Sequence, residues 1–350
     1  MADRIPLILD VDTGIDDALA LLYACASPDA ELLAVTCVAG NVDSTRVAAN
    51  TLAVLELAGR SDVPVHLGAE RPLLKPLVTT PETHGPAGIG HALLPPAARA
   101  RESGHAADRI IELARSRPGE ITLVTLGPLT NLALALEREP MLPVLLRRLV
   151  VMGGAYRSPG NTTPTSEWNV HVDPDAAKTV FAAWPAVEGA PRPLVMGLDV
   201  TERARLLPAH LERLALRAGA NDQDAGAFGS APLRVAGALA DYPVLRFVGD
   251  ALRFYFEFHE RYDAFYGAFI HDPFVVAAAL DPGLVTTQPV FVDVETGPGL
   301  AHGMTVADWR GLTGRPPNLD VAIDADAEAF LDRLIERVGD LAGRPAAVAR

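Results

Sequence analysis

The sequence has few residues of the kinds that bind nucleic acid or an anionic membrane surface. Lys and Arg together number 30, against 44 Asp and Glu, and the formal net charge is -14. Proteins that bind nucleic acid through its phosphates usually present a basic face, and anionic membranes attract basic segments. We therefore expect neither partner. A neutral or cationic small molecule, or a metal ion, remains compatible with this charge.

Cysteines and long apolar runs are equally scarce. The only cysteines are Cys25 and Cys37, both with apolar neighbours, which favours two buried thiols over a disulfide or a zinc site. No run approaches the ~18 apolar residues of a membrane-spanning helix. The apolar run before Asp10 is too short for a signal peptide. We therefore expect a protein of the reducing cytoplasm.

Apolar residues make up 49% of the chain, in short runs that alternate with amphipathic stretches. Six runs predict strands: 5–9, 32–38, 63–67, 121–126, 149–152 and 194–198. Six stretches predict helices: 16–26, 45–58, 108–117, 129–137, 174–183 and 208–218. Continuous apolar strands separated by helices are typical of a parallel sheet covered on both faces. We predict an α/β fold, a single domain over residues 1–350 around an open, mainly parallel sheet flanked by helices on both faces.

The C-terminal third follows another pattern. Three short runs predict a small antiparallel extension of the sheet: 285–294, 304–306 and 319–323. Residues 247–262 predict a helix rich in aromatic side chains, and residues 325–338 predict a closing helix. The irregular stretches 73–96 and 155–170 are long for loops of a compact domain, and such loops are often functional.

Polar residues follow several of the predicted strands. Open parallel sheets bind ligands beyond the carboxyl ends of their strands, and glycines near these ends allow the backbone to approach a ligand closely. We expect one cleft at which the polar strand ends converge: Asp10, Asp12, Asn41, Asn131, Tyr156 and Asp199.

The first of these strand ends reads ILDVDTGIDDALAL and contains Asp10, Asp12, Asp16 and Asp17. Two unit charges ~4 Å apart repel by ~4 kcal/mol at an effective dielectric constant near 20. Capping of the following helix accounts for Asp16 or Asp17 but leaves Asp10 and Asp12 unexplained. A bound cation would relieve the repulsion, and oxygen ligands without nearby His or Cys favour Ca²⁺ or Mg²⁺.

Two further segments contain candidate ligands. His271 and Asp272 precede Pro273 and an apolar stretch, so Asp272 presents another carboxylate at a helix start. The segment 161–173 offers the hydrogen-bonding groups and the flat face that a sugar requires, although ordinary turn residues would look the same: Asn161, Glu167, Trp168 and Asn169.

Six blocks occur in a particular order and spacing: DVDTGIDDALAL at the first strand end, VAGN at 38–41, LGPLTN at 126–131, VVMGGAY at 150–156, EWNVHVDPDAA at 167–177 and HDP at 271–273. In these blocks the chain resembles the inosine–uridine type nucleoside hydrolases, from Ile5 nearly to its end. The resemblance implies the α/β fold predicted above. It also implies a calcium-dependent N-ribohydrolase, a homodimer or homotetramer, that converts a nucleoside and water into ribose and free base.

The resemblance further implies which residues act. The Ca²⁺ ligands would be Asp12, Asp17, Asp272 and the backbone carbonyl of Leu126, with Asp10 supporting the site from behind. The substrate contacts would be Asp16 and Asn169 at the ribose 2′- and 3′-hydroxyls, Asn161 and Glu167 at the 5′-hydroxyl, Met152 beside the sugar, and Trp168 as a variant of a family Phe. Asn41 would orient the attacking water. Asp12 would be its general base, and His271 the candidate acid for the leaving base.

The base pocket is the part that the sequence determines least. His84 matches a family histidine near the base. Tyr255, His259 and Tyr262 are spaced to share a helical face that would cover the base, and a role as core residues is an equal alternative. The presence of both His84 and His271 favours a pyrimidine-preferring or nonspecific enzyme.

Two rival functions stay open. A metal-dependent hydrolase of another bond, such as a phosphatase, would want basic residues near the aspartates, and the motif has none. A non-catalytic nucleoside-binding protein would use the same cleft, but it would not need the catalytic carboxylates that this sequence contains.

Overall fold

The main sheet has eight strands in the order β3-β2-β1-β4-β5-β6-β12-β9. The computed structural model describes residues 4–230, 239 and 241–344. The strands of this sheet are β1 (Ile5–Val11), β2 (Ala30–Cys37), β3 (Val65–Leu67), β4 (Thr122–Thr125), β5 (Arg148–Met152), β6 (Leu194–Met196), β9 (Val285–Val290) and β12 (Leu319–Ala325). All neighbours pair in parallel except β12 and β9.

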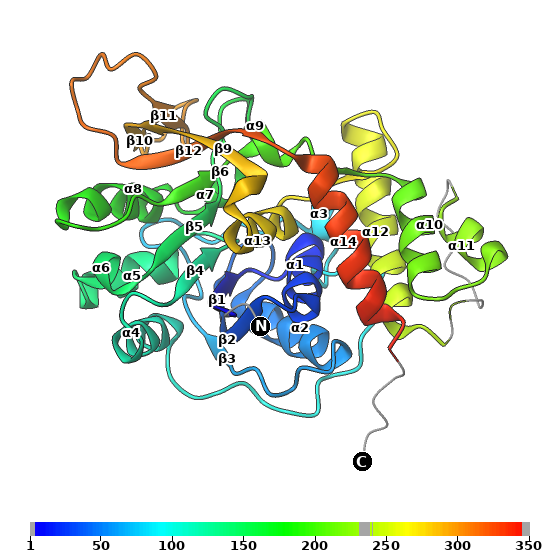
Figure 1. Ribbon diagram of the computed structural model, residues 1–350. Helices are drawn as coiled ribbons and strands as arrows, with labels where there is room; N and C mark the ends of the chain where they lie inside the picture. Colours follow the sequence, from blue (N-terminus) through cyan, green and yellow to red (C-terminus); the bar gives the residue numbers. More distant parts are fainter. Residues whose placement is uncertain (1–3, 231–238, 240, 345–350) are drawn as a thin grey trace.

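Helices cover both faces of the sheet (Figure 1). One face packs against α1 (Ile15–Ala26), α2 (Ser44–Leu57) and α13 (Asp272–Leu280), and α12 (Pro243–Tyr262) and α14 (Ala327–Ala342) pack in turn on α1. The other packs against α4 (Ala106–Ser116), α5 (Thr130–Arg138) and α8 (Pro174–Ala183). Along β1, Leu7 and Leu9 enter the first core while Ile8 enters the second, because successive side chains of a strand point to opposite faces. The predicted fold class is confirmed.

Shorter elements complete the described chain. The helices are α3 (Pro81–His84), α6 (Leu142–Leu145), α7 (Trp168–Val172), α9 (Leu198–Thr201), α10 (Pro208–Arg217) and α11 (Asp222–Phe228), with 3₁₀ turns at Trp184–Ala186 and Pro282–Leu284. The strands are β7 (Arg205–Leu206) paired with β8 (Ala268–Phe269), and β10 (Val292–Val294) paired with β11 (Thr305–Ala307), both antiparallel. None of the helices in the described ranges is long and apolar enough to cross a membrane.

The predicted strand 285–294 is two strands in the structure. β9 extends the main sheet, while β10 leaves it and pairs with β11. The Asn318 side chain accepts a hydrogen bond from the Val292 N–H at 2.8 Å and donates to the Val292 carbonyl at 2.8 Å. A side chain therefore takes the place of a neighbouring strand at this point. The antiparallel extension exists, but β12, expected within it, also pairs in parallel with β6.

The predicted strand 194–198 is shorter than expected, because Leu198 already begins α9. Asp199 is consequently not among the residues that line the cleft. Its carboxylate accepts hydrogen bonds from the backbone N–H groups of Tyr156, Arg157 and Ser158 at 2.7 to 3.0 Å. Asp199 thus stabilises the loop after β5, which corrects the expectation that this strand end faces the cleft.

Candidate active site

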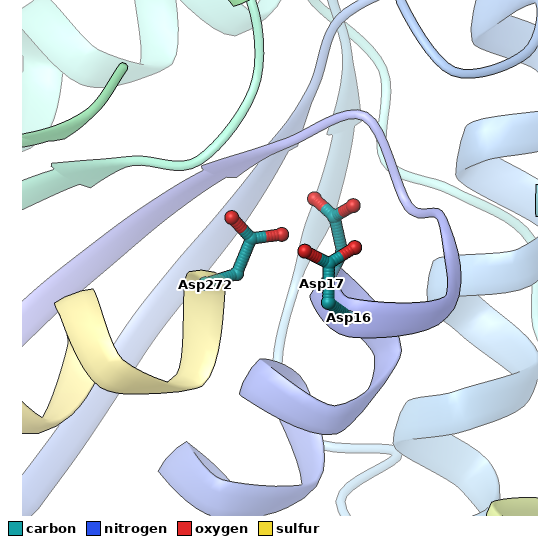
Figure 2. Close-up of side chains that lie close together, drawn as sticks. All are labelled: Asp16, Asp17 and Asp272. Atoms are coloured by element: carbon teal, nitrogen blue, oxygen red, sulfur yellow. The ribbon is translucent and has the colours of Figure 1, made fainter. Parts of the chain in front are cut away.

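Three acidic side chains from two helix starts meet at the carboxyl end of the sheet (Figure 2). Asp16 and Asp17 lie in the first turn of α1, and Asp272 is the first residue of α13. Carboxylate oxygens of the three lie within 4.8 Å of one another, and all three residues are buried. The cluster includes Asp16, which the resemblance assigns to the sugar, and it does not include Asp12.

Asp12 and Asp17 are fixed by backbone donors. Asp17 accepts from the N–H of Asp12 at 3.1 Å and from that of Gly14 at 2.8 Å, which ties the cluster to the turn between β1 and α1. Asp12 Oδ2 accepts from the Asn41 N–H at 2.8 Å. Asp12 Oδ1 is buried and has no hydrogen-bond partner among the described residues. One oxygen of Asp12 is therefore free to accept a hydrogen bond or to bind a cation.

Asp10 lies beneath this layer. Its Oδ1 accepts from Thr36 Oγ1 at 2.6 Å and from Asn131 Nδ2 at 2.8 Å, and the Leu126 N–H donates to its carbonyl at 2.7 Å. Asn131 Oδ1 in turn accepts from the Ala69 N–H at 2.8 Å. Asn131 is thus part of the support under the site, and the expectation that it faces the cleft is wrong.

The cluster carries an electrostatic cost that no described basic side chain offsets. Burial raises the pKa of Asp10 to about 7 and that of Asp16 to about 8. Burial also raises the pKa values of Asp12, Asp17 and Asp272, and repulsion between the carboxylates raises those of Asp12 and Asp272 further. Within residues 4–230, 239 and 241–344, no Lys or Arg forms an ion pair with any of the five.

The donor atoms fit a hard divalent cation. All available ligand atoms are oxygens, and the orphaned Asp12 Oδ1 is buried beside the cluster. Oxygen-only ligands are what Ca²⁺ and Mg²⁺ prefer. A divalent cation would also supply the missing positive charge, because buried carboxylates are stable as anions only when they are paired or metal-bound.

A cavity of about 540 Å³ opens above the carboxylates. It brings together most of the residues singled out from the sequence: Asp16, Asn41, His84, Leu126, Met152, Asn161, Glu167, Trp168, Asn169, Tyr255, His259, Tyr262, His271 and Asp272. Asp10, Asp12 and Asp17 lie beneath the cavity floor and do not line it. The volume falls in the range of pockets that bind small molecules.

One wall of the cavity is a network of amide and carboxylate groups. Glu167 caps α7, accepting from the Asn169 N–H at 2.7 Å, the Gly154 N–H at 2.9 Å and the Val170 N–H at 3.1 Å. Asn169 Nδ2 donates to the Leu126 carbonyl at 2.6 Å. These bonds fix both side chains before any ligand arrives, which lowers the entropic cost of binding.

The same wall extends over the loop before α7. Asn161 Oδ1 accepts from the Trp168 N–H at 3.0 Å. This bond joins the beginning of the loop to the start of α7. Asn169 Nδ2 also lies 3.3 Å from Met152 Sδ. Of the residues expected at the sugar, Asn161, Glu167 and Asn169 therefore belong to this wall, whereas Asp16 belongs to the carboxylate cluster.

Another part of the cavity lining consists of histidine and aromatic rings. The Tyr255 ring centroid lies 5.6 Å from that of His84 and 4.6 Å from that of His259. His84 Nδ1 accepts from the Ile15 N–H at 3.1 Å, and His271 Nδ1 lies 2.9 Å from Thr201 Oγ1. Burial lowers the pKa of both His84 and His271 to about 3.

Residues on α12 belong to the hydrophobic core and also line the cavity. Tyr255 and His259 are 3% and 4% exposed and still line the cavity, whereas Tyr262 is 58% exposed at its mouth. The two interpretations left open by the sequence therefore describe the same residues, because α12 packs on the core with one part of its surface and closes the cavity with another.

Several cavity residues escaped the sequence analysis: Thr80, Glu82, Thr83, Glu202, Phe258, Asp263 and Phe269. Asp263 stands four residues after His259, a helical spacing that could have revealed it. Glu202 comes just after α9, and burial raises its pKa to about 7, with Asp263 as the next cause. No motif indicated Glu202, because the turn that brings it to the cavity is visible only in the fold.

Comparison with known proteins identifies the class. Residues 7–332 match the model of the inosine-uridine preferring nucleoside hydrolases, and the chain belongs to this family. It is 38% identical to the pyrimidine-specific ribonucleoside hydrolase RihA of Salmonella paratyphi B, over 95% of this chain and 98% of the relative.

Solved structures agree with this assignment. A purine-preferring ribonucleoside hydrolase from Gardnerella vaginalis superposes with a TM-score of 0.83 at 32% identity, covering 97% of this chain and 99% of that one. The plant nucleoside hydrolase PpNRh1 superposes with a TM-score of 0.81 at 31% identity, covering 96% and 99%. The chain is a ribonucleoside hydrolase.

Close packing around Asp12 gives a test of the site. A Cβ at Gly40 would lie 2.1 Å from Asp12 Oδ2 and 2.9 Å from Pro128 Cδ, so Gly40→Ala must displace the carboxylate. A misplacement of about 1 Å in an active site can cost ~100-fold in rate, and we expect a loss of at least that size in nucleoside hydrolysis. Reducing-sugar release measures it.

Gly299→Ala is the matched control, because a Cβ at Gly299 meets nothing within 4 Å. This variant should keep full activity. Thermal unfolding of both variants separates a displaced carboxylate from a misfolded chain. Full activity in a folded Gly40→Ala variant would show that the position of Asp12 does not matter.

Proposed function

We propose that the enzyme cleaves the N-glycosidic bond of ribonucleosides at a Ca²⁺ centre, with a pyrimidine-preferring or broad choice of base. One observation carries the proposal: a buried cluster of carboxylates, without basic partners among the described residues, lies directly under a cavity whose wall offers amide and carboxylate groups for a sugar. The absence of Lys and Arg from the described cavity lining disfavours a phosphorylated substrate.

Asp12, Asp17, Asp272 and the Leu126 carbonyl would hold the Ca²⁺. When bound, the ion supplies a template that holds a water and the sugar diol together. Asp16 and Asn169 would bind the 2′- and 3′-hydroxyls, and Asn161 and Glu167 the 5′-hydroxyl. Departure of the base builds positive charge on the ribose, which the surrounding carboxylates stabilise. Asp10, bonded to Thr36 and Asn131, supports β1 from below.

Asp12 would be the general base for the attacking water. Its Oδ1 and the Oδ1 of Asn41 are both buried and without hydrogen-bond partners in the described part of the chain. The two residues are joined by the bond from the Asn41 N–H to Asp12 Oδ2, so both acceptors belong to the same part of the site. Asn41 would orient the water, and Asp12 would take its proton.

Replacement of Asp12 tests this assignment. Asp12→Ala should reduce ribose release by several orders of magnitude, because it removes a metal ligand and the proton acceptor together. The wild-type protein should contain one Ca²⁺ per chain by elemental analysis, and a chelator should abolish its activity until Ca²⁺ is restored. A folded Asp12→Ala protein with more than a few per cent of the activity, or full activity in chelator, would contradict the proposal.

His271 would assist departure of the base by protonating it. The residue lines the cavity, and its contact with Thr201 through Nδ1 leaves Nε2 for the base. Proton transfer to the base requires the cationic ring, because a neutral imidazole that lost its Nε2 hydrogen would become an anion. In the cationic ring Nδ1 donates to Thr201 Oγ1, whose hydroxyl donates to the Gly197 carbonyl at 3.2 Å, and Nε2 carries the proton that the base receives. Burial opposes this form by lowering the pKa of His271, so the negative charge of the departing base must favour it.

Leaving-group dependence decides whether His271 acts as an acid. We expect His271→Ala to slow hydrolysis of natural nucleosides by 10²–10⁴-fold, the usual contribution of a general acid. Hydrolysis of p-nitrophenyl riboside, whose leaving group needs no proton, should change little. Equal slowing of both substrates in steady-state assays would remove His271 from this role.

The base preference rests on the histidines and on the relatives. His84 and His271 both reach the cavity, the RihA relative is named as pyrimidine-specific, and the Gardnerella relative as purine-preferring. We expect uridine and cytidine to be hydrolysed at least as well as inosine and adenosine. A panel of these nucleosides, read by reducing-sugar release, is the measurement. A strict requirement for purines would overturn this part of the proposal.

The remaining expectations stay predictions. Cys25 and Cys37 are unpaired, which is the ordinary state of thiols in a reducing compartment, and we propose the cytoplasm as the location. We also propose one domain for residues 1–350 and a homodimer or homotetramer, as the resemblance implies.

A further inference from the structure

His259 forms a pair with an acidic side chain at the edge of the cavity. It lies in the last turn of α12, and its Nδ1 is 2.8 Å from Oδ2 of Asp263, four residues further on. His259 is 4% exposed, and both residues line the cavity. The geometry joins the ring firmly to the end of its own helix.

This bond determines which ring nitrogen carries the hydrogen. A carboxylate can only accept, so Nδ1 must donate to Asp263. Burial lowers the pKa of His259 below its usual value, which favours the neutral ring, and in that form the single hydrogen is on Nδ1. Nε2 is then a bare acceptor. It is buried and has no hydrogen-bond partner in the described chain.

Neighbouring rings prevent the imidazole from turning over. Its centroid lies 4.6 Å from that of Tyr255, 4.9 Å from that of Phe269, 5.2 Å from that of Phe258 and 5.5 Å from that of Phe265. An unpaired buried acceptor typically costs about 1–3 kcal/mol. A donor supplied by the ligand would remove that cost.

We propose that His259 selects the nucleobase by accepting a hydrogen bond from one of its N–H groups, and that Asp263 positions His259 by fixing its tautomer. Bases that meet this requirement carry a ring N–H, as in uracil and hypoxanthine, or an exocyclic amino group, as in cytosine and adenine. The proposal rests on the nucleoside hydrolysis proposed above and adds the feature of the base that is recognised.

Paired substrates isolate this hydrogen bond. Uridine has N3–H, whereas pyrimidin-2-one riboside has neither that N–H nor a substituent at C4. Inosine and purine riboside form the corresponding purine pair, differing at N1–H and C6. In each pair the measured quantity is the ratio of kcat/KM for the N–H substrate to kcat/KM for its analogue. Comparing each variant's ratio with the wild-type ratio cancels differences in leaving-group reactivity.

His259→Phe keeps an aromatic ring of similar shape and removes the acceptor. We expect it to lower the ratio by about tenfold, the value of one net hydrogen bond of about 1.4 kcal/mol. His259→Gln offers a carbonyl oxygen and should restore part of the ratio. An unchanged ratio in a folded, active His259→Phe variant would overturn the proposal.

Asp263→Asn tests the tautomer itself. The amide introduced by this substitution can either donate to Nδ1 of His259 or accept from it, so the ring hydrogen is no longer held on Nδ1 and part of the molecules carry it on Nε2. The ratio should fall by up to about tenfold, and it should fall no further when Asp263→Asn is added to His259→Phe. A purely structural role would lower kcat/KM for both substrates equally and would not vanish in the His259→Phe background.

Asp250→Asn is the matched control on the same helix, since Asp250 pairs with Arg253 and does not line the cavity. Its ratio should equal that of the wild type. If the wild-type enzyme releases no ribose from any nucleoside, the proposed function is wrong. Turnover with an unchanged ratio in the two site variants would defeat only the assignment of His259 and Asp263, so the two failures are distinct.

Discussion

Burial of five carboxylates, with no basic partner in the described chain, is the constraint on which the rest of this structure depends. Mutual repulsion would open the site unless every remaining contact held it closed. Backbone N–H groups of Asp12, Gly14 and Asn41 bind the upper carboxylates, and Thr36 and Asn131 bind Asp10 below. The parallel sheet makes this possible, because it directs the ends of neighbouring strands to one edge.

The sequence predicted the fold because periodicity is a local property and the parallel pattern is strong. It also predicted the acidic site, since four aspartates within one strand-helix turn need no tertiary information. The sequence-based prediction failed where the role of a residue depends on the direction in which its side chain points. Asn131 and Asp199 both follow strands, yet one supports Asp10 from beneath and the other caps a loop. The spacing of His259 and Asp263 is visible in the sequence, but their hydrogen bond requires that α12 continue to Tyr262, which only the structure shows.

The cavity wall that carries Asn161 and Glu167 depends on a hairpin from the far end of the chain. Thr305 Oγ1 donates to the Ala155 carbonyl at 2.7 Å and accepts from the Ala155 N–H at 3.1 Å. Ser166 donates to the His302 carbonyl, and Thr165 to the Leu300 carbonyl. The loop that carries Asn161 and Glu167 is thus braced by β11 and the turn before it, so the small antiparallel sheet supports the cavity wall as well as contributing Val292 and Val294 to the core.

The meeting of α1 and α13 has a thermodynamic consequence. Asp16 and Asp17 come from the start of the chain and Asp272 from its last third, so the unfolded polypeptide has no such set of ligands. Any cation held by the three binds the native state alone and adds RT ln(1 + [M]/Kd) to the free energy of unfolding. The repulsion that opposes folding in the free protein thereby becomes the reason why folding and ion binding reinforce each other.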